Sequence, residues 1–109
     1  MIQKAFKMKL YPNQEKEYEK RHSQIFPELV KELKEHGVTK YFIFHDKESN
    51  YLFSYVEMES EELWNRVSET SACKKWWEYM KDIMETNPDN SPVSIELSQV
   101  FNLNRLFNN

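Results

Sequence analysis

Two side chains in the first quarter of the chain have the residue types and the spacing of an acid–base pair. Tyr18 and His22 are four residues apart, in a stretch whose apolar residues recur at helical spacing. On a helix they lie on the same face, one turn apart. Histidine is the side chain best suited to moving protons near neutral pH. The pair predicts a proton-transfer site, although the spacing by itself favours an ordinary surface or packing histidine.

Three further aromatic side chains are candidates for ligand binding. Trp76 and Trp77 are adjacent on an expected helix, where neighbours point about 100° apart, so that one packs inward while the other borders a cavity. Aromatic faces pack against the C–H faces of sugars, and an indole N–H can bond a hydroxyl. On spacing alone, the pair favours a plain core stripe. Tyr41, near the start of an expected strand, has a hydroxyl that can reach either a ligand or solvent.

The rest of the composition excludes several other kinds of site. The histidines, acidic residues and single cysteine, Cys73, form no cluster with metal-ligand spacing, so we expect no metal. The single glycine, Gly37, argues against a Gly-rich phosphate loop, and we expect no cofactor. The net charge of −3 has mixed signs and no basic stripe, which argues against nucleic acid. Neither a signal peptide nor a membrane span is evident, so we expect a soluble, cytoplasmic protein.

The elements that must position these residues alternate between strands and helices. The length of 109 residues fits one domain. Two-residue and helical periodicities predict a strand near residues 6–10, a helix bent at 23–26 before a proline, a hairpin of strands 41–45 and 51–58, a helical region over 61–84 broken near 70–71, and a last strand over 93–97. This order is the split β-α-β arrangement of ferredoxin-like α+β folds, with an antiparallel sheet and the helices on one face.

Three residues are expected to cap helix ends. Asn13 is the expected N-cap of the first helix, and Gly37 is expected in a left-handed cap after the second helical piece. Ser60 is expected to cap the next helix, and an apolar stripe extends its second half to Met84. The sheet face without helices needs a cover, and we expect a second copy of the chain to provide it.

Beyond these local patterns, the chain resembles the L-rhamnose mutarotase family over about its first 103 residues. The segments that carry the resemblance follow one another in order: MIQKAFKM, EYEKRH, PELVKELKEHG, YFIFHDK, LFSYVEMESEELWN, CKKWWEYMKDIM and NPDNSPVSIEL. The family often has Asn-Pro after the histidine and Trp before Pro-Glu-Leu, where this chain has Ser23, Gln24 and Phe26. We expect residues 1–103 to form the mutarotase domain and 104–109 to be a C-terminal tail.

The resemblance implies a cofactor-free enzyme that interconverts the α and β anomers of L-rhamnose as a dimeric α+β-barrel. It implies that His22 is the proton donor, here expected to act on the ring oxygen. It further implies that Tyr18, Tyr41, Trp76 and Trp77 contact the sugar. The alternatives are a mutarotase for a related deoxyhexose such as L-fucose, a cofactor-free monooxygenase of the same barrel type, and a non-catalytic sugar-binding module. One architecture serves many activities, so the fold alone does not choose among them.

Overall fold

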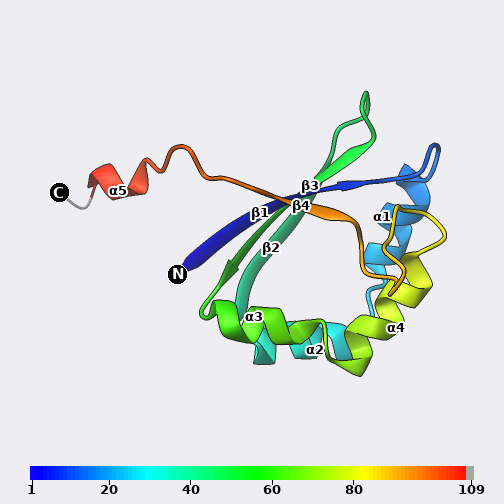
Figure 1. Ribbon diagram of the computed structural model, residues 1–109, viewed down its shortest axis with the longest axis horizontal. Coiled ribbons are helices and arrows are strands. Elements are labelled where there is room, and N and C mark those ends of the chain that lie inside the picture. Colours follow the sequence, from blue (N-terminus) through cyan, green and yellow to red (C-terminus); the bar gives the residue numbers. More distant parts are fainter. Residues whose placement is uncertain (108–109) are drawn as a thin grey trace.

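The computed structural model describes residues 1–107 as four strands and five helices (Figure 1). In chain order these are β1 (Ile2–Lys9), α1 (Glu15–Ser23), α2 (Pro27–Glu35), β2 (Val38–His45), β3 (Tyr51–Met58), α3 (Glu61–Val67), α4 (Ser71–Met80), β4 (Ser94–Leu97) and α5 (Asn104–Phe107). The expected ferredoxin-like order is confirmed, with each of the two connecting helical regions divided in two.

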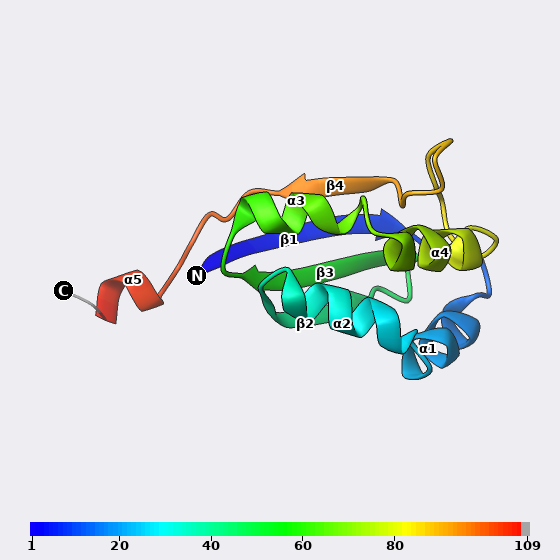
Figure 2. The ribbon, with the colours of Figure 1, turned by 90° about the horizontal axis from the view of Figure 1, so that it is seen from below.

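The strands form one antiparallel sheet in the order β2-β3-β1-β4. Helices α1 to α4 all lie on one side of this sheet (Figures 1 and 2), as the sequence predicts. Residues along β3 alternate between the two faces, and the four that face the helices, Leu52, Ser54, Val56 and Met58, are buried. No helix among residues 1–107 lies on the opposite face, so that side of the sheet is open.

The first helical region is divided by its proline. Pro27 is the first residue of α2, where its missing N–H costs no hydrogen bond, and residues 24–26 form the predicted bend. Gly37 follows α2 with a φ of 83°, which confirms the left-handed cap. The prediction that Asn13 caps α1 is wrong. Asn13 itself has a left-handed backbone with a φ of 64°, and Gln14 occupies the cap position without a side-chain hydrogen bond.

The second helical region is divided by two capping hydroxyls. Ser60 Oγ accepts a hydrogen bond from the backbone N–H of Leu63 at 3.2 Å, as predicted. Thr70 Oγ1 accepts one from the N–H of Cys73 at 3.2 Å and begins α4. The predicted stripe extends beyond the helix, because α4 ends at Met80. Ile83 and Met84 are buried all the same. Ile83 lies in the turn that follows, and Met84 forms an isolated antiparallel bridge with Leu10.

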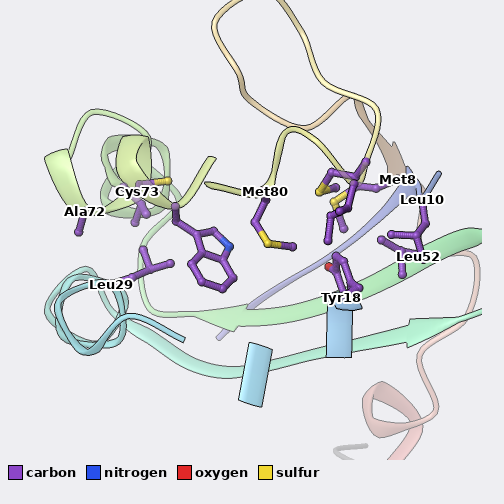
Figure 3. Close-up of a cluster of buried hydrophobic side chains, with 12 residues drawn as sticks. Met8, Leu10, Tyr18, Leu29, Leu52, Ala72, Cys73 and Met80 are labelled. Atoms are coloured by element: carbon purple, nitrogen blue, oxygen red, sulfur yellow. The ribbon is translucent and has the colours of Figure 1, made fainter. Parts of the chain in front are cut away.

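A single apolar core lies between the helices and the sheet (Figure 3). At one end, Tyr18 from α1 lies near the sheet residues Met8, Leu10 and Leu52. At the other end, Leu29 packs with residues from the first turn of α4, and Met80 lies between the two ends. The core therefore ties α1 and α4, the two helices that carry most of the candidate site residues, to the same sheet.

The chain beyond β4 leaves the body of the molecule as an extended arm that ends in α5 (Figure 1). The last two residues of the expected tail, 108–109, lie outside the described residues. Within residues 1–107, no helix is long and apolar enough to cross a membrane.

Candidate functional site

A cavity of about 970 Å³ opens between the helices and the sheet. All five candidate residues line it: Tyr18 and His22 from α1, Tyr41 from β2, and Trp76 and Trp77 from α4. The walls between them are mostly apolar. The folded chain thus brings together residues that are more than fifty positions apart in the sequence, in one hollow large enough for a monosaccharide.

Tyr18 and His22 lie on one face of α1, as their spacing predicts, and their rings are stacked. Their centroids are 4.2 Å apart and their planes are inclined by 30°. The imidazole of His22 also meets Trp76 edge to face, at 5.2 Å between centroids and 88° between planes. His22 is therefore held between two aromatic rings and is neither a surface residue nor a fully enclosed one.

One hydrogen bond determines which nitrogen of His22 carries a proton. Nδ1 lies 3.0 Å from the backbone carbonyl oxygen of Tyr18, one helical turn earlier. A carbonyl oxygen only accepts, so Nδ1 must be the donor and carry hydrogen. In the neutral imidazole, Nε2 then has a free lone pair. The bond therefore fixes a tautomer whose second nitrogen is a base.

Burial determines the charge state of His22. Desolvation lowers the pKa of the imidazole, because burial penalises the charged form, and the hydrogen bond to the Tyr18 carbonyl opposes this effect only partly. At pH 7 the ring is therefore predominantly neutral. A neutral ring with Nε2 free accepts a proton first and can donate it afterwards.

The two tyrosines of the cavity are neutral hydrogen-bonding groups at physiological pH. Burial raises the pKa of Tyr18 above its ordinary range, and the nearby phenol of Tyr41 raises it further. Burial also raises the pKa of Tyr41 to about 12, with a smaller contribution from Cys73. Tyr41 is 40% exposed, and because it faces the helices, part of that exposed surface lines the cavity. Both hydroxyls can donate to and accept from a ligand without changing charge.

The two tryptophans divide their roles as their adjacency predicts. Trp76 is 7% exposed and packs in the core beside His22. Trp77 is half-buried and borders both the cavity and a neighbouring hollow near the loop at residues 89–91. Trp76 thus forms an inner wall, and Trp77 lies between the two hollows.

Arg21 is a supporting residue that the sequence did not single out. Its guanidinium donates to Glu17 at 2.8 Å, to Asp82 at 2.8 Å and to the backbone carbonyl of Tyr79 at 2.7 Å. These bonds join the end of α1 to the end of α4, and so hold His22 against Trp76. The Glu17–Arg21 spacing was visible as an ordinary helical ion pair. Nothing local indicated the partner at Asp82, sixty residues away.

Phe26, at the bend before α2, also supports the site. Its ring meets Trp76 edge to face at 5.0 Å and stacks on Tyr79 at 5.5 Å. Phe26 therefore contacts Trp76, which in turn contacts His22. A change at the bend is in this way transmitted to the cavity wall.

Charged groups lie mainly at the edge of this cavity. Four exposed charged residues contribute to its lining: Glu15, Lys16, Glu19 and Lys47. Among residues 1–107, no group of three or more metal-ligating side chains could hold an ion. Of the five candidate residues, only His22 has a side chain that exchanges a proton near neutral pH.

Comparisons with known proteins indicate which family the chain resembles. A family model described as L-rhamnose mutarotase matches residues 3–103. An L-rhamnose mutarotase of Clostridium beijerinckii is 71% identical over 103 residues, which cover 94% of this chain and 99% of that protein. The crystal structure of an L-rhamnose mutarotase from Formosa agariphila has a TM-score of 0.86 and 45% identity, covering 94% of this chain and 98% of that one.

A more distant likeness concerns the fold alone. A candidate antibiotic biosynthesis monooxygenase from Bordetella bronchiseptica has a TM-score of 0.67 at 13% identity, covering 91% of this chain and 96% of that one. This confirms the fold class expected from the order of the elements. At such low identity it gives no support to a monooxygenase activity.

The hydrogen bond at His22 makes a direct spectroscopic prediction. At pH 7, two-dimensional ¹H–¹⁵N spectra of the imidazoles should show His22 with hydrogen on Nδ1 and none on Nε2, and its pKa should lie below the ordinary value of about 6.5. His36, whose Nδ1 lies 2.7 Å from the Glu32 carbonyl, serves as an internal reference for the same tautomer outside the cavity. Hydrogen on Nε2 of neutral His22, or a raised pKa, would contradict this geometry.

Proposed function

We propose that this chain, which belongs to the L-rhamnose mutarotase family, interconverts the α and β anomers of L-rhamnose. The observation that carries the proposal is the environment of His22. A neutral imidazole with a free Nε2 lines a cavity with two neutral tyrosines and two indoles. That set suits a reaction whose net change in charge and redox state is zero.

Ring opening requires one proton to leave and one to arrive. The anomeric hydroxyl O1 loses its proton, the C1–O1 bond becomes a carbonyl, the C1–O5 bond breaks, and the ring oxygen O5 gains a proton. We propose that His22 Nε2 takes the proton from O1 and delivers it to O5. Both oxygens are bonded to C1, so one nitrogen can serve both. In this scheme His22 is the proton donor to the ring oxygen only after it has acted as the base.

Ring closure on the other face completes the exchange. The open aldehyde turns about its C1–C2 bond, and O5 attacks the opposite face of the carbonyl. His22 removes the proton of O5 and returns it to O1, so the imidazole ends neutral, as it began. The cavity has only to hold both anomers and the open-chain form with O1 and O5 within reach of His22 Nε2.

The other four residues hold the sugar in this scheme. The hydroxyls of Tyr18 and Tyr41 bind sugar hydroxyls, and their raised pKa values keep them uncharged throughout. Trp76 and Trp77 cover the apolar side of the pyranose, where L-rhamnose has a methyl group in place of a hydroxyl. The hydrogen bonds and the apolar wall together fix which side of the ring faces His22.

We also propose that the chain works as a homodimer through its open sheet face. The outward side chains of this open face include Phe42, Phe44, Phe53, Tyr55, Ile95 and Leu97. The outward β1 residues Ala5 and Lys7 lie between the β3 and β4 members of this set. Phe44 is 65% exposed and Ile95 54%, although both are large and apolar. Large exposed apolar side chains gathered on one face are typical of an interface. Two copies packed sheet to sheet about a two-fold axis would cover it.

The arm after β4 supports the same assembly. Val100 is 95% exposed and Phe101 67%, and Leu106 and Phe107 in α5 are also exposed. The arm continues from β4, which carries two residues of the open face, and projects away from the body (Figure 1). A second copy on the open face would therefore offer the arm a surface to pack against.

Two further expectations remain part of this proposal. We propose that residues 1–103 are the mutarotase domain, supported by the end of the family match at 103, and that 104–109 are an addition to it. We propose a cytoplasmic location, because the free thiol of Cys73 is buried in the core and suits a reducing compartment.

Replacement of His22 tests the proposed function. His22→Ala should keep the fold. It should lower the enzyme-catalysed rate of L-rhamnose anomer exchange about 100- to 10,000-fold, because the only proton carrier among the candidate residues is lost. NMR saturation transfer between the two anomeric protons measures the rate, and L-fucose in a parallel sample measures the preference between sugars. His36→Ala is the matched control, since it removes a histidine with the same backbone bond outside the cavity. Exchange at the wild-type rate in His22→Ala would refute the assignment.

The assembly is tested at Phe44. The wild-type chain should sediment at twice its mass of 13.3 kDa, and Phe44→Glu should sediment as a monomer because a charge would be buried in the interface. Val30→Glu, at another exposed apolar residue but on α2, should leave the dimer intact. A monomeric wild type, or an intact Phe44→Glu dimer, would rule out this interface.

A further inference from the structure

The floor of the cavity contains a buried polar side chain that the reaction scheme has not used. The helix-facing row of β3 consists of Leu52, Ser54, Val56 and Met58, and Ser54 is the one residue of the four that is not apolar. Ser54 is 3% exposed, and it lines the same cavity as His22. Its partners in the sheet are Phe6 on β1 and Ile43 on β2, so the strands on both sides place apolar residues next to it.

The hydroxyl of Ser54 has no protein partner in the described part of the chain. None of the side-chain hydrogen bonds among residues 1–107 involves it, yet no side-chain oxygen there is both fully buried and unsatisfied. Because Ser54 Oγ has no partner and is not a fully buried oxygen, it must reach the surface of the cavity that Ser54 lines. A buried hydroxyl without a partner is costly, so the contents of the cavity must supply one.

The sheet register places Ser54 close to Tyr41. Tyr41 pairs with Val56 and Ile43 pairs with Ser54, so Tyr41 and Ser54 are diagonal neighbours on the same face of adjacent strands. Such neighbours are about 7–8 Å apart, and their Cβ atoms are somewhat closer. A sugar ring can bridge that span with two of its hydroxyls. Tyr41 and Ser54 then form one polar edge, opposite the indoles.

We propose that Ser54 binds a ring hydroxyl of the sugar and thereby helps to select the substrate; this inference rests on the proposed function. A serine hydroxyl does not titrate near neutral pH, so it takes no part in the proton transfer. It donates and accepts one hydrogen bond at a fixed position on the rigid sheet. A site built to bond a hydroxyl discriminates against sugars that lack it.

Ser54→Ala measures the contribution of this hydroxyl. Anomer exchange at increasing L-rhamnose concentration should show KM raised about 3- to 10-fold, the effect of one neutral hydrogen bond, with kcat changed less than KM. Ser98→Ala, on the exposed stretch after β4, is the control for the same substitution and should behave as wild type.

Deoxy sugars distinguish a binding role from a structural one. Of 2-, 3- and 4-deoxy-L-rhamnose, one lacks the hydroxyl that Ser54 binds. With the wild-type enzyme, the KM for that sugar should be raised by the same factor as Ser54→Ala raises the KM for L-rhamnose. On that sugar, Ser54→Ala and the wild type should have equal KM values. An unchanged KM in Ser54→Ala, or an equal loss on L-rhamnose and all three analogues, would overturn the role of Ser54 while the proposed function stands. A wild-type chain that does not accelerate L-rhamnose exchange would overturn both.

Discussion

The hydrogen bond between His22 Nδ1 and the Tyr18 carbonyl is the interaction on which the rest of the site depends. It closes one helical turn with a side chain and leaves Nε2 as a base in a partly buried ring. Without it, the imidazole could present either nitrogen to the cavity. Burial between Tyr18 and Trp76 then keeps the ring neutral. Tautomer and charge together make a single side chain able to take up a proton and return it, so the scheme calls on no second acid or base.

The fold serves this interaction by holding α1 and α4 at a fixed distance over the sheet. Arg21 ties the ends of the two helices together, and the shared core ties both to the strands. The sheet in turn supplies a rigid floor, where Tyr41 and Ser54 are placed by strand register and not by loops. The two faces of the sheet thus have different tasks: one carries the cavity, and the other, in our proposal, carries the second subunit.

Much of this could be predicted from the sequence, because local signals were consistent. The alternation of apolar residues predicted β1 and β3. Pro27 predicted the break between α1 and α2, and Gly37 predicted the end of α2. The predictions were wrong where the packing of the folded chain overrode a local sequence pattern. Asn13 is a good cap residue, but the chain uses it for the tight turn into α1. The stripe to Met84 predicted a longer helix, because residues buried in a turn or a β-bridge are as apolar as residues buried in a helix. The link from Arg21 to Asp82 depends on the packing of α1 against α4, which no spacing reveals.

The pH dependence of anomer exchange tests the central claim most directly. After subtraction of the uncatalysed rate, exchange of L-rhamnose should be constant near pH 7.5 and should fall as the pH drops through the pKa of His22, with a midpoint below about 6.5. The decline follows because protonation of Nε2 removes the base. His45, the other histidine that lines the cavity, is controlled for with His45→Gln, which should keep the same midpoint. A rate that rises as the pH falls would show that the imidazolium is the active form and would contradict this account.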